Sequence, residues 1–298
     1  MPENLPLVII GGNSLVAPYL MENLRVEGRI ADVISRNTVP VPEGFTFTAL
    51  DLRQDRNWIA PENAVIISLL PLWVLATYLP RFIGVNSIIA LGSTSLFSKV
   101  GSSDSVERAT AAGLEVAENN LREWCRRSNV HGTLLRPTMI YDGIHDNNIA
   151  RMARFIRRFH CLPLAAPAKG LRQPIHAGDV ARAILKTLGN SSAEGKALNI
   201  AGGEVLTYRA MAEKVFDGLG VKRRLIMLPE SWLEKSFRWG SRAGIVREKA
   251  FGSSVFRRMN EDLVFEVAEG LRLLDYQPRG FLPRFDVPHK DAPHKDGL

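Results

Sequence analysis

The first 140 residues alternate short apolar runs with amphipathic segments. The run Leu7–Ile10 ends in a glycine-containing turn, and apolar residues then follow helical spacing from Leu15 to Leu24. A run that is apolar on both faces is typical of a strand in a parallel sheet, because helices cover both faces of such a sheet. The pattern therefore predicts a strand, a tight turn and a helix.

The same alternation continues along the chain. Helical spacing marks Ser102–Arg127, and apolar runs ending at turn-forming residues predict strands over Ile30–Ser35, Phe45–Leu50, Val65–Leu70, Ser87–Leu91 and Gly132–Leu135. Strands that alternate with helices in this way predict an α/β fold with a doubly wound parallel sheet of the Rossmann type.

Beyond residue 140 the alternation is less regular. Helices are predicted over Asn148–Phe159, Asp179–Leu188 and Tyr208–Leu219, and a strand over Ala197–Ala201. We expect 1–140 and about 170–190 to form a dinucleotide-binding domain. Residues 141–169 and about 197–287 are expected to form a smaller C-terminal substrate-binding domain, and 288–298 a flexible tail.

Composition and charge exclude several classes of protein. The chain has 298 residues, 46% of them hydrophobic, and a formal net charge of +7. The basic residues form short, scattered clusters, so we expect no nucleic-acid surface. We expect no secretory signal, because the N-terminal residues lack a basic segment followed by an apolar run. We also expect no membrane span, because the longest uncharged stretches are shorter than the about 20 apolar residues of a span. The pattern leaves the oligomeric state open.

The cysteines and histidines carry no pattern of their own. Cys125 and Cys161 are too few for a disulfide framework, and the histidines lack the spacing of metal ligands. We therefore expect no metal site and a reducing, cytoplasmic compartment.

The turn after the first predicted strand is the clearest candidate for ligand binding. A strand that opens through glycines into a helix directs main-chain N–H groups at a pyrophosphate. The turn resembles the GxxGxxG turn of the extended short-chain dehydrogenase/reductase family, with Gly11 kept and with Ser14 and Ala17 at the second and third glycines. Backbone geometry alone is the other reason for such glycines.

Later segments resemble the same family, in order and spacing. Leu134–Tyr141, Arg172–Ala181 and Ala197–Leu206 are similar to blocks of its NAD-dependent epimerase/dehydratase branch. The resemblance implies a nicotinamide dinucleotide and a small or nucleotide-sugar-like substrate. It implies cofactor contacts from Gly11, Asn13, Ser14, Leu15, Ser35, Arg36, Asp51, Leu52, Leu69, Leu70 and Pro137, with Asp51 and Leu52 beside the adenine.

The choice of cofactor depends on the end of the second strand. An acidic residue there binds the ribose 2′-OH of NAD, whereas an arginine accommodates the 2′-phosphate of NADP. Ser35 stands at this position and Arg36 follows it. We therefore expect NADP, with NAD as the alternative. The other interpretation of Arg36 is a surface residue at a strand end.

The catalytic residues of the family are incompletely represented. In the resembled family a Tyr moves the proton, a Lys four residues later lowers its pKa, and a Ser or Thr orients the substrate oxygen. Ser93 stands at the orienting position, although a turn bonding its own backbone is the alternative. Thr110 and Leu114 occupy the Tyr and Lys positions, so Tyr141 is the candidate for a relocated acid.

Two functions follow from this pattern. The first is an NAD(P)-dependent oxidoreductase or epimerase/dehydratase-like enzyme with a degenerate active site. The alternative is a non-catalytic NAD(P)-binding sensor or assembly factor that has lost the YxxxK pair. The retained length of the substrate domain favours the first, the missing pair favours the second, and the fold alone does not decide.

Overall fold

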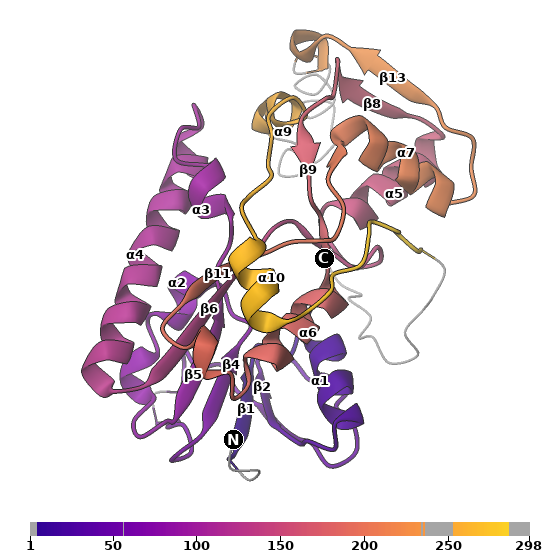
Figure 1. Ribbon diagram of the computed structural model, residues 1–298. Helices are drawn as coiled ribbons and strands as arrows, with labels where there is room; N and C mark the ends of the chain where they lie inside the picture. Colours follow the sequence, from indigo (N-terminus) through magenta and orange to yellow (C-terminus); the bar gives the residue numbers. More distant parts are fainter. Residues whose placement is uncertain (1–4, 56, 234, 236–252, 286–298) are drawn as a thin grey trace.

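Seven parallel strands form one sheet in the computed structural model, which describes residues 5–55, 57–233, 235 and 253–285. The strand order is β11-β6-β5-β4-β1-β2-β3 (Figure 1). The strands are β1 (Leu7–Ile10), β2 (Asp32–Ser35), β3 (Thr46–Ala49), β4 (Val65–Ser68), β5 (Ser87–Leu91), β6 (His131–Pro137) and β11 (Ala197–Ile200). The order runs outward in both directions from β1 and β4, which confirms the predicted doubly wound α/β class.

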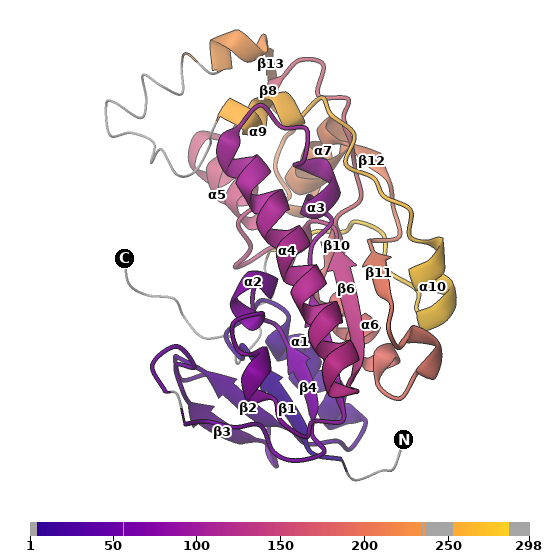
Figure 2. The ribbon, with the colours of Figure 1, turned by 90° about the vertical axis from the view of Figure 1, so that its left-hand side faces the viewer.

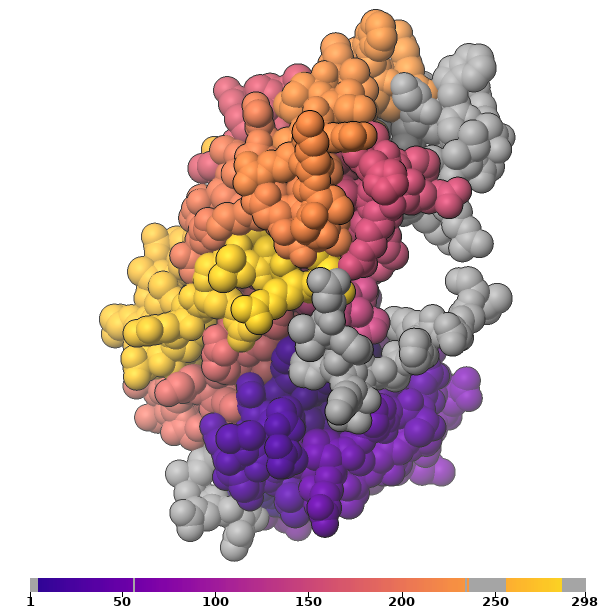
Figure 3. All heavy atoms as spheres, turned by 90° about the vertical axis from the view of Figure 1, so that its right-hand side faces the viewer, coloured from indigo at the N-terminus to yellow at the C-terminus, as the bar shows by residue number. Residues whose placement is uncertain are grey.

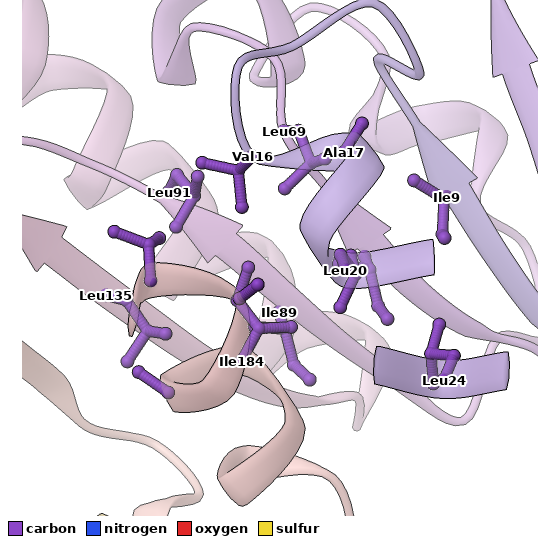
Figure 4. Close-up of a cluster of buried hydrophobic side chains, with 14 of the residues drawn as sticks. Ile9, Val16, Ala17, Leu20, Leu24, Leu69, Ile89, Leu91, Leu135 and Ile184 are labelled. Atoms are coloured by element: carbon purple, nitrogen blue, oxygen red, sulfur yellow. The ribbon is translucent and has the colours of Figure 1, made fainter. Parts of the chain in front are cut away.

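Helices cover both faces of this sheet. One face packs against α1 (Ala17–Val26) and α6 (Ala177–Thr187), and the other against α2 (Leu72–Leu75), η1 (Leu79–Arg81) and α4 (Ser105–Ser128) (Figure 1). In the first core, Leu20 and Ile184 from the two helices face Ile89 of the sheet (Figure 4). Burial on both sides explains why the central strands β1, β4 and β5 consist almost entirely of apolar residues.

The long helix α4 has well-defined ends. Asp104 is its N-cap, and the carboxylate accepts a hydrogen bond of 2.8 Å from the N–H of Val106. Asn129 ends it in the left-handed conformation, with φ of 51°. Such a cap and stop are typical of helix termini. A short helix, α3 (Ser95–Ser98), precedes α4.

A smaller part of the molecule lies beyond the carboxyl ends of the strands (Figure 1). It contains α5 (Ile149–Phe159), α7 (Tyr208–Gly218) and α9 (Ser253–Arg258), together with the parallel pair β8 (Leu162–Ala165) and β13 (Leu225–Leu228). Short pairs connect it to the sheet: β7 (Ile140–Tyr141) with β10 (Ile175–His176), and β9 (Leu171–Arg172) with β12 (Leu206–Thr207). Its core includes Ile156, Leu164, Val215 and Phe216.

The last described segment joins the two parts. In Figure 3, the yellow surface, which belongs to the later part of residues 253–285, lies between the indigo N-terminal part and the orange smaller part. This segment includes α10 (Ala268–Leu274), which packs against β11. η2 (Ser191–Ala193) lies in the connection before β11.

β11 and α10 correct part of the expected domain division. Both fall within 197–287, which the sequence analysis assigned to the smaller domain, yet β11 pairs in parallel with β6 as the edge strand of the large sheet. The chain leaves the sheet after β6 and returns to it only at residue 197, where β11 adds the last strand. The alternation of strands and helices along the sequence therefore becomes irregular before the sheet is complete. The rest of the division stays a prediction, and the tail 288–298 lies outside the described residues.

The helices predicted after residue 140 correspond to α5, α6 and α7, with ends that differ by one or two residues. In the part of the chain that the structure describes, no helix has the length and apolar character needed to cross a bilayer.

Candidate functional site

A cavity of about 640 Å³ opens between the carboxyl edge of the sheet and the smaller part. Ligands of doubly wound sheets bind at this edge. The sheet side contributes the turn after β1, the loop Gly92–Ser95 after β5, and Pro137 at the end of β6. The opposite wall contains Asp142, His145, Asn148, Arg172, Gln173 and Arg258.

The turn after β1 is held tightly against β2. Gly11 has φ of +97°, and the N–H groups of Gly11 and Gly12 both donate to the carbonyl of Ile34, at 2.9 and 3.2 Å. A Cβ on Gly12 would lie 2.6 Å from Cγ1 of Val33. Ala17 at the start of α1 is fully buried, so small residues at these positions let the helix approach the sheet closely.

Two main-chain donors of this turn remain available. The N–H of Ser14 donates to the Gly11 carbonyl at 2.9 Å, and the N–H of Val16 donates to Ser14 Oγ at 3.3 Å. The N–H groups of Asn13 and Leu15 have no acceptor among the described residues, and both residues line the cavity. Free N–H groups at the start of a helix suit a phosphate group.

The residues expected around the adenosine lie outside the cavity lining. Ser35 is buried, and its Oγ has no hydrogen-bond partner in the described part of the chain. Arg36 is exposed, whereas Leu52 and Leu69 belong to the core. Leu70 lies beside Gly11, because its Cδ2 would be 3.4 Å from a Cβ built there. Their contacts with a dinucleotide stay a prediction.

Asp51 is engaged by a neighbouring arginine. Its carboxylate accepts hydrogen bonds from Nε and the terminal nitrogen of Arg53, both at 3.1 Å. The Arg53 side chain is the main reason that the pKa of Asp51 lies below its ordinary value, and the positive charge of Arg36 acts in the same direction. Asp51 therefore remains ionised at the position that the family resemblance puts beside the adenine.

Ser93 lines the cavity, and its hydroxyl has a local partner. Its Oγ accepts a hydrogen bond of 3.1 Å from the N–H of Ser95. This is the backbone turn that the sequence offered as an alternative. Because Oγ uses a lone pair here, its O–H is still available to donate into the cavity. The two interpretations of Ser93 are compatible.

Tyr141 lies in a different environment from the one expected of an acid. Its side chain is only 1% exposed and does not line the cavity. Its ring packs edge-on against His176 and Phe281, with centroids 5.2 and 5.0 Å apart. Burial raises the pKa of Tyr141 to about 12. The geometry does not favour the predicted role of Tyr141, because β7 directs its ring into the core below the cavity.

Helix α4 supplies no acid either. The Thr110 hydroxyl donates to the carbonyl of Val106 at 2.8 Å, and Leu114 is buried in the core beneath the helix. Within the described residues, α4 contributes nothing to the cavity lining. The structure thus places neither residue of the missing pair at the cavity.

The sequence analysis missed an Asp–His pair in the cavity wall. Oδ2 of Asp142 lies 3.1 Å from Nδ1 of His145, and both residues line the cavity. Metal-ligand spacing does not reveal this pair; the signal in the sequence is an Asp three residues before a His within a turn. Among the described residues, no group of three or more His, Cys, Asp or Glu side chains could hold a metal ion.

Among the residues that the structure describes, three cationic side chains line the cavity, and two of them are already paired. Arg258 forms an ion pair of 2.7 Å with Glu107, and Arg172 donates to the carbonyls of Leu171 and Glu261, at 2.7 Å each. The side-chain amine of Lys99 has no hydrogen-bond partner among the described residues. Burial, and secondarily the charge of Arg258, lower the pKa of Lys99. Lys99 is therefore the cation available to an anionic ligand.

Comparison with curated proteins gives a partial match. The chain is 32% identical over 136 residues to the mitochondrial NADH dehydrogenase [ubiquinone] 1 alpha subcomplex subunit 9 of Arabidopsis thaliana. The match covers 45% of this chain and 31% of that protein, so the chain spans about a third of its curated relative. No family model matches the chain.

Solved structures match over nearly the whole chain. UDP-glucuronic acid 4-epimerase from Bacillus cereus, in complex with NAD, has a TM-score of 0.69 at 12% identity, covering 95% of this chain and 98% of that one. MoeE5, in complex with UDP-glucuronic acid and NAD, has a TM-score of 0.66 at 16% identity, covering 94% and 95%. Both complexes contain NAD, so the expected preference for NADP finds no support in them.

At these identities the match concerns the fold, and it agrees with the blocks that the sequence shares with one family. The strand order, the glycine turn and the smaller part over the carboxyl ends of the strands are common features of that architecture. The chain therefore has the fold of the extended short-chain dehydrogenases/reductases, in the form found in NAD-dependent epimerases.

Proposed function

We propose that this chain binds a nicotinamide dinucleotide and acts as an NAD(P)-dependent oxidoreductase or epimerase/dehydratase-like enzyme. The observation that carries the proposal is the pair of free N–H groups at Asn13 and Leu15, which face the same cavity as Ser93. The N–H groups suit the pyrophosphate, and the Ser93 hydroxyl suits an oxygen on a carbon that exchanges hydride with the nicotinamide.

The proposed substrate is a small anionic molecule of the nucleotide-sugar kind. Lys99 supplies a positive charge without an ion-pair partner among the described residues, and Asn148 and Gln173 supply neutral polar groups in the same lining. A diphosphate needs such a combination of charge and hydrogen-bond donors. MoeE5, which has the same fold, was solved with UDP-glucuronic acid.

The first experiment measures dinucleotide binding by titration calorimetry with NAD⁺, NADH, NADP⁺ and NADPH. Ser14→Asp places a carboxylate where the pyrophosphate would lie, and we expect affinity to fall at least about tenfold, since like charges in contact cost several kcal/mol. Ser14→Asn is the neutral control, because both side chains keep an oxygen that can accept from the N–H of Val16. Equal affinity of the two variants, or no binding by the unaltered chain, contradicts the proposal.

Within this proposal the cofactor is NADP, on the strength of Arg36 after β2. The proposed compartment is the cytoplasm, on the strength of Cys125 and Cys161, which are free and half-buried in the structure. Free thiols suit a reducing compartment. Fractionation of cells expressing the full chain, with detection by antibody, tests the location.

A second candidate is a non-catalytic NAD(P)-binding subunit or assembly factor. The observation that favours it is the occupation of the Tyr and Lys positions by Thr110 and Leu114, away from the cavity. Its curated relative is a subunit of NADH dehydrogenase. The test is a panel of UDP-sugars and small carbonyl compounds, each incubated with NADH or NADPH. If the chain binds the dinucleotide but consumes none of it with any of these compounds, the second candidate is favoured.

A further inference from the structure

We propose that His145, oriented by Asp142, transfers the proton in this cavity in place of the absent tyrosine. The inference rests on the proposed function, because it names the acid–base group of that same site. His145 is then the catalytic residue and Asp142 the positioning residue.

Asp142 is fixed at the start of the loop after β7. Its Oδ1 accepts main-chain hydrogen bonds from Ile144 and His145 at 2.8 Å each, and from Asp146 at 3.1 Å. Its Oδ2 lies 3.1 Å from Nδ1 of His145. The Asp142 side chain is 5% exposed, whereas the His145 side chain is 36% exposed. A buried carboxylate thus holds a ring that is open to the cavity.

The arrangement determines the tautomer of His145. Burial alone would raise the pKa of Asp142, but the main-chain donors and the imidazole together hold it below its ordinary value, so the carboxylate is ionised. An ionised carboxylate only accepts hydrogen bonds, so Nδ1 carries the hydrogen and neutral His145 has its lone pair on Nε2. Among the described residues, Nε2 has no hydrogen-bond partner.

The loop that carries the pair is held at its other end by a second aspartate. Asp146 accepts hydrogen bonds from the N–H groups of Gly143, Asn148 and Ala150, at 2.9, 2.8 and 3.1 Å. Two aspartates therefore fix this loop from both ends. A catalytic group needs such support from its surroundings to keep its position relative to the substrate.

Other ionisable side chains fit the role less well. His176 uses Nδ1 to accept the N–H of Gly178 at 3.0 Å, and neither it nor Tyr141 lines the cavity. Tyr19 lines the cavity, but burial raises its pKa to about 12. Lys99 also lines it, without a carboxylate bonded to its amine. His145 is the group that combines access to the cavity with a fixed orientation.

The proposed step is balanced within the cavity. When an alcohol is oxidised, a bound oxidised nicotinamide dinucleotide would accept the hydride of its C–H bond. The O–H bond breaks, its proton passes to Nε2 of His145, and a carbon–oxygen double bond forms. The products are a carbonyl compound, the reduced dinucleotide and an imidazolium ion, which returns the proton in the reverse reaction.

The test compares turnover and binding in the same variants. UDP-glucuronic acid and UDP-glucose are the probes, with NAD⁺ or NADP⁺, and turnover is followed as absorbance of the reduced dinucleotide. We expect His145→Gln to lower turnover by about 10²–10⁴-fold, the usual contribution of acid–base catalysis, while calorimetry shows unchanged dinucleotide affinity. His131→Gln is the matched control, because Nδ1 of His131 also faces a carboxylate, Glu194 at 2.9 Å, but lies outside the cavity.

Two further variants separate catalysis from folding. Added imidazole is expected to restore part of the turnover of His145→Ala, which a purely structural defect would not allow. Asp142→Asn presents an amide N–H to Nδ1, so Nδ1 becomes the acceptor and the ring hydrogen moves to Nε2. We expect turnover to fall with KM unchanged. Nitrogen NMR of the His145 ring should show the hydrogen on Nε2.

The outcomes distinguish the two proposals. If the unaltered chain does not bind a dinucleotide, the proposed function itself is wrong. If the dinucleotide binds and His145→Gln keeps full turnover, the assignment of His145 is wrong. It is also wrong if Lys99→Gln, and not His145→Gln, loses turnover. Intact binding without turnover of the probes also overturns it, and leaves the non-catalytic candidate.

Discussion

Gly12 shows how single atoms control the turn above β1. A Cβ at this position would lie 2.6 Å from Cγ1 of the fully buried Val33. We expect Gly12→Ala to lower the free energy of unfolding by about 1–3 kcal/mol, the usual cost of overpacking, and to weaken dinucleotide binding by displacing the N–H groups of Asn13 and Leu15. Thermal denaturation and calorimetry measure the two effects.

The control for this change is the same substitution at Gly113 in α4, where no described atom lies within 4 Å of the added Cβ. Alanine is the better helix former by about 1 kcal/mol, so Gly113→Ala is expected to raise the free energy of unfolding. Equal effects at the two positions would show that the contact with Val33 is unimportant.

Arg36 tests the choice of cofactor. A charge-assisted bond to a 2′-phosphate contributes about 1.5–3 kcal/mol, which corresponds to about ten- to a hundredfold in affinity. We expect Arg36→Ala to remove a preference for NADPH while NADH binding stays the same, as measured by calorimetry. Arg29→Ala removes an equal charge before the other end of β2 and serves as the control. Tighter binding of NADH than NADPH by the unaltered chain contradicts the assignment.

At the scale of elements, the start of α6 depends on an uncharged histidine. His176 is the N-cap of this helix, and its Nδ1 accepts the N–H of Gly178 at 3.0 Å. Burial, and secondarily the charge of Arg279, lower the pKa of His176 from 6.5 to about 4. Because the folded state favours the neutral ring, the stabilisation is complete above pH 6.5 and is lost as the pH falls toward about 4.

We therefore expect the free energy of unfolding to fall by an amount on the order of 3 kcal/mol between pH 6.5 and about 4. Each unit by which the pKa of His176 differs between the folded and unfolded states corresponds to about 1.36 kcal/mol. Urea denaturation at several pH values measures it. His176→Asn keeps an N-cap acceptor that does not titrate there, so its decline should be shallower, whereas His131→Gln should follow the unaltered chain. Identical slopes for His176→Asn and the unaltered chain would refute the linkage.

Most elements of the large sheet could be predicted from the sequence, because the central strands β1, β4 and β5 are apolar on both faces and the apolar runs end at turn-forming residues. β8 and β13 were not predicted: β8 contains Pro163, and β13 is a short run whose pairing partner lies far away in the sequence. The site was predicted only where a local motif carries it, as at Asn13–Leu15 and Ser93. The pair Asp142 and His145 depends on how a loop folds over a cavity, which periodicity does not encode.

At the scale of the whole molecule, α9 of the smaller part contacts the start of α4 beside the cavity (Figure 2). Arg258 pairs with Glu107 at 2.7 Å, and Glu107 accepts a hydrogen bond of 2.7 Å from Ser102 Oγ. Arg257 donates to the hydroxyls of Ser102 and Ser103. The Arg258–Glu107 pair is largely buried, and the contacts of Arg257 join parts of the chain that lie about 150 residues apart in sequence.

We expect Glu107→Gln to lower the free energy of unfolding by about 1.5–3 kcal/mol, the contribution of a hydrogen bond to a charged group, because Arg258 loses its counter-charge. Amide hydrogen exchange should accelerate over 253–258 and 102–107. Glu115→Gln removes an exposed carboxylate from the same helix and should change neither quantity. Unchanged exchange in Glu107→Gln would mean that α9 is held by other contacts.

The late return of β11 to the sheet has a consequence for synthesis. Until residues 195–200 leave the ribosome, β6 has no neighbour on one side, and the N–H groups of Leu134 and Thr138, which later donate to Lys196 and Ile200 at 2.9 and 3.0 Å, have no partner strand. An unpaired strand edge is a template for pairing with another chain. Nascent or truncated chains that stop before residue 197 therefore expose the unpaired edge of β6, which can pair with another chain. Pairing with β11 covers that edge and is expected to reduce aggregation.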